Sequence, residues 1–60
     1  MNRGDAVFVQ LCGGARAERL VWDVSEARIA VCTVEAYKRW ERYGEPPLTL
    51  GFSLRYVEAV

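Results

Sequence analysis

Apolar and polar residues alternate along most of the chain, and this period of two predicts β-strands. In the first such stretch Val7, Val9 and Leu11 fall on one face, which we expect to be the core face. The stretches are short and are separated by glycine, proline or polar residues, as is typical of a small all-β protein. Strands are predicted at Asp5–Leu11, Ala17–Val24, Arg28–Thr33, Leu48–Phe52 and Tyr56–Val60.

The second stretch places Leu20, Trp22 and Val24 on one face, and this periodicity predicts that Trp22 lies in the core. A polar break, Ser25–Ala27, joins the second and third strands as an antiparallel hairpin. Gly13-Gly14 predicts a loop after the first strand, because glycine adopts positive φ at little steric cost. Gly51 interrupts the fourth strand, where it predicts a bulge or a close backbone approach.

The period changes between residues 34 and 43, where no glycine or proline occurs and apolar side chains recur at helical spacing. We therefore predict a helix over Val34–Tyr43. Thr33 is a suitable N-cap, and Glu35 lies in the first turn, where a negative charge suits the helix dipole. Gly44 is placed to end the helix, and Pro46-Pro47 cannot continue it.

These elements fit one domain over residues 1–60, with neither an internal repeat nor a linker. Ser53–Arg55 has the length of one 3₁₀ turn between the last two strands. The prediction is a mainly β fold: a five-stranded antiparallel barrel with a short helix between the third and fourth strands. A barrel is favoured over a sandwich because closure removes exposed edges.

The two ends of the chain carry motifs that resemble a known fold family. Gly51-Phe52-Ser53-Leu54-Arg55-Tyr56-Val57-Glu58 looks like the end of SH3 domains, and Gly4-Asp5-Ala6-Val7-Phe8-Val9 is similar to the start of many SH3-like barrels. The whole pattern is similar to small bacterial SH3-like proteins of unassigned function that have a helix before the last strands. The resemblance implies an SH3-like barrel. Tyr56 matches the tyrosine that lines the family's proline-rich peptide groove, but Ser53 and Arg55 replace its proline and asparagine partners.

Composition points away from enzyme chemistry. The chain has no histidine, so the usual base of nucleophilic catalysis is missing, and its carboxylates are scattered. Two cysteines, Cys12 and Cys32, are too few for a disulfide scaffold or a zinc site. We predict a non-enzymatic protein with neither cofactor nor metal. A small oligomeric enzyme with a site on its symmetry axis is a remote alternative.

Aromatic residues are the main candidates for binding. Tyr37, Trp40 and Tyr43 share one flank of the predicted helix, where they either cap an open end of the barrel or form an exposed interface. Tyrosine and tryptophan are favoured at interfaces because the ring anchors while the polar tip tolerates water. Our leading hypothesis is an interaction module that binds a protein partner or itself. Its predicted binding residues are Tyr37, Trp40, Tyr43 and Tyr56, and Trp22 would extend the same surface if it is not core.

Charge and hydropathy supply the remaining expectations. Eight basic and eight acidic residues give zero net charge, which disfavours nucleic-acid binding because phosphate contacts require a basic excess. The alternative is a nucleic-acid-binding barrel that uses local basic clusters: Arg16, Arg19, Lys38, Arg39 and Arg42. No apolar run approaches the ~20 residues that span a bilayer, and the opening lacks the apolar segment of a signal peptide. We therefore expect no membrane partner, a cytoplasmic location and reduced cysteines.

Overall fold

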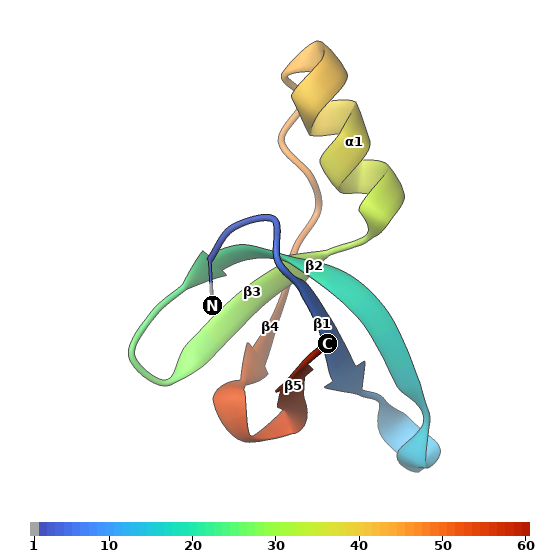
Figure 1. Cartoon of the computed structure of the whole chain (residues 1–60), viewed down its shortest axis with the longest axis vertical. Helices are drawn as coiled ribbons and strands as arrows, with labels where there is room; N and C mark the ends of the chain where they lie inside the picture. The colour runs from blue at the N-terminus through green and yellow to red at the C-terminus, as the bar shows by residue number, and fades with distance from the viewer. Residues whose placement is uncertain (1) are drawn as a thin grey trace.

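Five antiparallel strands form one sheet in the computed structural model, which describes residues 2–60 (Figure 1). The strand order is β4-β3-β2-β1-β5, and the helix lies between β3 and β4, so the mainly β fold with one helix is confirmed. Among the described residues the sheet does not close into a barrel, because β4 and β5 remain its two edges. The elements are β1 (Ala6–Gln10), η1 (Cys12–Gly14), β2 (Arg16–Val24), β3 (Arg28–Cys32), α1 (Val34–Tyr43), β4 (Leu50–Ser53), η2 (Leu54–Tyr56) and β5 (Val57–Ala59).

A small cluster of branched aliphatic side chains forms the core. Val7 and Val9 are buried as predicted, but Leu11 lies beyond the end of β1 and is exposed, so its place on the core face was wrongly predicted. β-branched residues such as valine suit the core face of a sheet because they pack well on a pleated, half-buried surface. The buried cluster is Val7, Val9, Val21, Ile29, Val31 and Val57, with Ala17, Phe52 and Leu54 packed against it.

A bulge in β2 explains where strict alternation fails. Val21 pairs with Val31 and Val24 with Ile29, and the register shifts between Val21 and Asp23. The extra residue there is Trp22, so the core face of β2 changes parity at this point. The prediction that Trp22 is core is wrong, because Ala17 and Val21 share the core face of β2 and Trp22 follows Val21 on the other face; it is half-buried outside the core cluster.

The bulge predicted at Gly51 is absent, because Gly51 pairs with Ala30 in an uninterrupted register. A Cβ built on Gly51 would make only ordinary contact with the Arg28 guanidinium, 3.6 Å away, so no close backbone approach explains this glycine either. The predicted glycine loop is confirmed: Gly13 and Gly14 have φ of 80° and 84°, which other residues rarely adopt.

The helix begins and ends where its sequence predicts. The amide of Ala36 donates to Thr33 Oγ1 at 3.1 Å, so Thr33 is the N-cap. Gly44 adopts the left-handed conformation, with φ of 75°, and its amide donates to the carbonyl of Trp40. The predicted 3₁₀ turn is also present, as η2 one residue later than expected.

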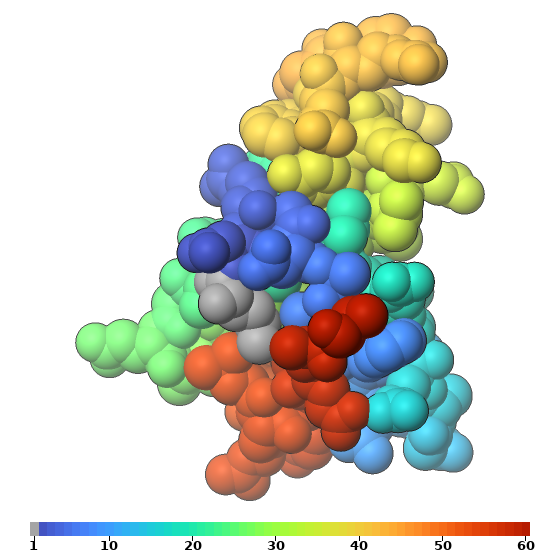
Figure 2. Space-filling view, viewed as in Figure 1, coloured from blue at the N-terminus to red at the C-terminus, as the bar shows by residue number. Residues whose placement is uncertain are grey.

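The helix projects away from the sheet instead of covering it. We call residues 33–49 the arm: α1 and the extended segment that returns alongside it to β4 (Figure 1). In the space-filling view the arm, yellow to orange, stands beyond the rest of the molecule (Figure 2). The accessible surface is 4449 Å², whereas a compact monomer of 6.8 kDa has about 3,950 Å². The protein thus exposes about 500 Å² more than its mass predicts.

No helix within residues 2–60 combines the length and the apolar character that a membrane span needs.

The two thiols differ in environment. Cys12 is exposed in η1, whereas Cys32 is buried at the end of β3 and its Sγ donates to the Leu20 carbonyl at 3.8 Å. Burial raises the pKa of the Cys32 thiol. Because the thiolate is the reactive form, this shift lowers the reactivity of Cys32.

We expect iodoacetamide at pH 8 to modify Cys12 in the native protein and to modify Cys32 at least about a hundredfold more slowly, because Cys32 must await opening of the sheet. Mass spectrometry of Cys12→Ser, which keeps only Cys32, measures the slow rate directly. Both thiols should react alike in urea. Equal native rates would contradict the placement of Cys32 in the sheet.

Candidate interaction surface

Three aromatic side chains join the arm to the sheet. Trp22 lies on β2 at the bulge, and Tyr37 and Trp40 lie on α1. The ring centroids of Trp22 and Trp40 are 4.8 Å apart and their planes are perpendicular. Tyr37 is edge-on to both, at 6.3 Å from Trp22 and 5.5 Å from Trp40. Edge-to-face pairs of this kind add about 0.5–1.5 kcal/mol beyond burial.

Arg3 covers this aromatic cluster. Its guanidinium carbon lies 4.2 Å from the ring centroid of Trp22 and 5.7 Å from that of Trp40. Its Nε also donates to the Trp22 carbonyl at 2.7 Å. A cation above two indole faces is favourable, and the bulge supplies the carbonyl that fixes it. The cluster therefore contacts its own cation and has little free ring surface.

The backbone next to Arg3 fits closely around Tyr37. Gly4 has φ of 92°, and a Cβ at this position would come within 3.0 Å of the Tyr37 hydroxyl oxygen. The amide of Gly4 donates to the carbonyl of Val21 at 2.9 Å. The segment before β1 is thus held against both β2 and α1, which explains why glycine occupies this position.

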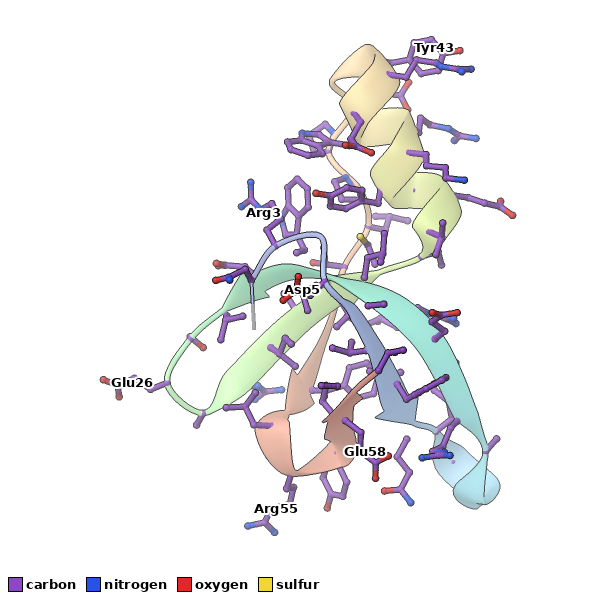
Figure 3. The ribbon with its side chains drawn as sticks, viewed as in Figure 1. Arg3, Asp5, Glu26, Tyr43, Arg55 and Glu58 are labelled. Carbon is purple, nitrogen blue, oxygen red and sulfur yellow. The ribbon has the colours of Figure 1, made fainter. Side chains whose placement is uncertain are left out.

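Tyr43 is the last residue of α1, at the tip of the arm and about one turn beyond Trp40 (Figure 3). Its side chain is 68% exposed. The Arg42 guanidinium lies 6.0 Å from its ring centroid, at the limit of a cation–π contact. Of the three aromatic residues predicted on the helix, Tyr43 alone therefore presents an accessible ring at the surface.

A groove runs between α1 and the segment that returns to β4. It has a volume of about 360 Å³, and its walls include Ala36 on the helix and Pro46 and Pro47 on the returning segment. Leu48 lies at its end and is 94% exposed. The two prolines hold the returning segment extended, because their φ is fixed and they cannot join the helix. We call Tyr43, Leu48 and this groove the arm surface.

Tyr56 lies at the far end of the molecule from the arm, in η2. It borders a hollow of about 60 Å³ together with Phe8 and Arg16. Arg16 Nη1 donates to Glu58 Oε2 at 2.6 Å across the hollow, and its guanidinium lies 5.3 Å from the Phe8 ring centroid. Figure 3 shows Glu58 and Arg55 at this end and Tyr43 at the other. The four predicted binding residues therefore do not form one continuous surface.

The basic side chains do not gather on one face. Arg16 is paired with Glu58, and Arg19 donates to the carbonyl of Glu18 at 2.8 Å. The basic side chains on the helix, Lys38, Arg39 and Arg42, line a shallow depression. Two carboxylates, Glu35 and Glu41, line the same depression. Within residues 2–60 no three carboxylates or thiols gather into a group that could hold a metal ion.

Sequence reasoning missed Arg3, Leu48 and Leu50. Leu48 and Leu50 belong to a run without charge, residues 48–54, and such a run predicts a buried strand, so nothing in the sequence indicated that both side chains are exposed. Arg3 carried no signal either, because its role depends on a bulge that places Trp22 beneath it.

Comparisons with models of protein families, with curated proteins and with solved structures found no significant match.

Proposed function

We propose that this protein is a non-enzymatic interaction module that binds a protein partner through the arm surface. The observation that carries the proposal is the placement of the helix. An amphipathic helix normally buries its apolar side on the core, but no residue of α1 is buried here. Tyr37 and Trp40 hold the helix to Trp22 on the sheet, and the end of the helix with Tyr43 extends into solvent.

The chemistry of the arm surface supports a peptide or protein partner. Leu48 lines a groove with proline walls, and Tyr43 is exposed at the tip of the same arm. Apolar and aromatic anchors of this type contribute most of the binding energy at protein interfaces. Mixed charges around the groove, from Arg39 and Glu45, provide a polar rim. The lining offers no base–nucleophile pair, which favours binding over catalysis.

The strand order and the position of η2 support an SH3-like arrangement for the scaffold. A meander from β1 to β4, followed by a 3₁₀ turn and a last strand beside β1, is the order that the terminal motifs imply. On this proposal the arm is an addition to the SH3-like scaffold, and binding through it differs from proline-rich recognition at Tyr56.

Nucleic-acid binding is the weaker proposal. Its candidate residues are divided between the Arg16 end of the sheet and the helix, and carboxylates accompany both groups. Two separate groups of basic side chains can neutralise only a few neighbouring phosphates of one nucleic acid at a time.

Affinity capture from the source cells tests the proposed function by comparing variants. We expect at least one protein to be recovered with the wild type and about tenfold less with the double variant Tyr43→Ala/Leu48→Ser, the loss that ~1.4 kcal/mol produces. Both side chains are exposed, so the fold should tolerate these changes.

Arg55→Ala is the matched control, because Arg55 is exposed at the end of the molecule opposite Tyr43 (Figure 3). It should recover the same protein as the wild type. Identical recovery with the arm variant and the wild type would refute binding through the arm surface.

A further inference from the structure

The arm carries a projecting ring and a hollow on the same side of its helix. Ala36, which lines the groove, and Tyr43 are seven residues apart on α1. Seven residues make almost two full turns of an α-helix, so the two side chains leave the helix on the same side. The ring of Tyr43 is exposed, and the walls of the groove include Pro46 and Pro47. Two copies of this surface can therefore fit each other, ring into groove.

The surface that the protein exposes beyond that of a compact monomer belongs to the arm. None of residues 33–49 is buried, and within this range only four are even partly covered: Ala36, Tyr37, Trp40 and Pro47. Covering the excess of about 500 Å² in each of two copies would remove about 1,000 Å² from solvent, which is the lower limit for a specific interface. The arm alone thus has enough surface for a dimer, without any contribution from the sheet.

Charge favours a second copy over a different protein as the partner. The groove is lined by one cation and one anion, Arg39 and Glu45. Within residues 2–60 neither side chain forms an ion pair in its own copy. A two-fold axis between two arms can place each Arg39 beside the Glu45 of the other copy, which leaves no excess of either sign. The whole chain has zero net charge, so two copies do not repel each other over longer distances.

We propose that the partner of the arm surface is a second copy of this chain: two arms pack antiparallel about a two-fold axis, and Tyr43 of each copy enters the groove of the other. Antiparallel packing puts the tip of each arm against the side of its neighbour, as this exchange requires, and the two sheets lie at opposite ends of the paired arms (Figure 1). This inference rests on the proposed function, because it names the partner of the same site.

Sedimentation equilibrium between about 1 µM and 1 mM tests the proposal. The wild type should change from a monomer of 6.8 kDa to twice that mass as its concentration rises. Tyr43→Ala should raise the dimer Kd at least about tenfold, because it removes the ring that fills the groove. In a dimer of labelled and unlabelled copies, isotope-filtered NMR should show nuclear Overhauser effects between the Tyr43 ring and the Ala36 methyl group. Within one copy these two residues lie about 10 Å apart along the helix, too far for this effect.

Glu41→Ala is the matched control on the same helix. Glu41 is exposed and lies two residues before Tyr43, which is about 200° round the helix and so on its opposite side. The dimer Kd of this variant should stay within about twofold of the wild type. The proposal is overturned by a wild type that remains monomeric at 1 mM, by a Tyr43→Ala dimer of unchanged affinity, or by a dimer without the intermolecular contact between Tyr43 and Ala36.

Affinity capture separates this inference from the proposed function. The tagged wild type should recover the untagged chain itself, and Tyr43→Ala/Leu48→Ser should recover less of it. Arm-dependent recovery of a different protein, by a chain that is monomeric at 1 mM, would overturn the pairing of two copies and leave the proposed function intact. Recovery that the arm variant does not change, together with a dimer that Tyr43→Ala does not weaken, would overturn both.

Discussion

Replacing Ile29 by alanine is expected to lower the free energy of unfolding by about 3 kcal/mol. Ile29 is the largest fully buried side chain of the core cluster, and it pairs with Val24 on one side and Phe52 on the other. A domain of 60 residues has a total stability of about 3–9 kcal/mol. The change therefore removes a third or more of the stability, and at the lower limit of that range it unfolds the protein.

Urea denaturation followed by tryptophan fluorescence measures this loss. Leu48→Ala is the control, because it also cuts a branched aliphatic side chain back to alanine, but at a position that is almost fully exposed. Its unfolding free energy should differ from the wild type by less than about 0.5 kcal/mol. Equal effects of the two substitutions would contradict the placement of the core on the Ile29 face of the sheet.

Replacing Trp40 by alanine is expected to unfold α1 while the sheet persists. The helix has ten residues, and isolated helices shorter than about 12–15 residues are marginal in water. Its stability therefore depends on the packing of Trp40 and Tyr37 against Trp22. Because Trp40 is half-buried, we expect a cost of about 2 kcal/mol, below the range for fully buried tryptophan.

Amide hydrogen exchange separates local from global unfolding. In Trp40→Ala the amides of α1 should lose their protection, and those of β1, β2 and β3 should keep theirs. Tyr43→Ala is the control on the same helix, since Tyr43 makes none of the contacts that join the arm to the sheet. A helix that stays protected in Trp40→Ala would show that the cluster does not anchor the arm.

The sequence predicts local elements well because local signals determine them. Thr33, Gly44 and the two prolines limit the helix to residues 34–43, as the structure confirms. Alternation also identifies the buried pairs of β1 and β3. The failure is in β2, where both faces carry apolar residues: Leu20 and Trp22 lie off the core face, which Ala17 and Val21 occupy. The bulge after Val21 then reverses the faces, so Val24 pairs with Ile29, and nothing in the local pattern indicates it.

The candidate site was less predictable because it depends on how elements pack. Helical spacing groups Tyr37, Trp40 and Tyr43, but two of these rings contact Trp22 and only Tyr43 is free. Tyr56 lies far from them because η2 is at the other end of the sheet. Leu48 at the end of the arm and Leu50 at the start of β4 are exposed because the helix projects into solvent instead of covering them, and residue spacing carries no information on that.

The arm also has a simple place in the topology of the chain. Val31 and Leu50, close to its two ends, are direct partners across β3 and β4. The chain therefore leaves the sheet and returns to it at adjacent points, and a two-residue hairpin turn would span the same gap. Residues 33–49 are thus a self-contained insertion in an otherwise continuous meander. No strand pairing includes residues 33–49, so the length of this insertion can change while every strand keeps its neighbours in the sheet.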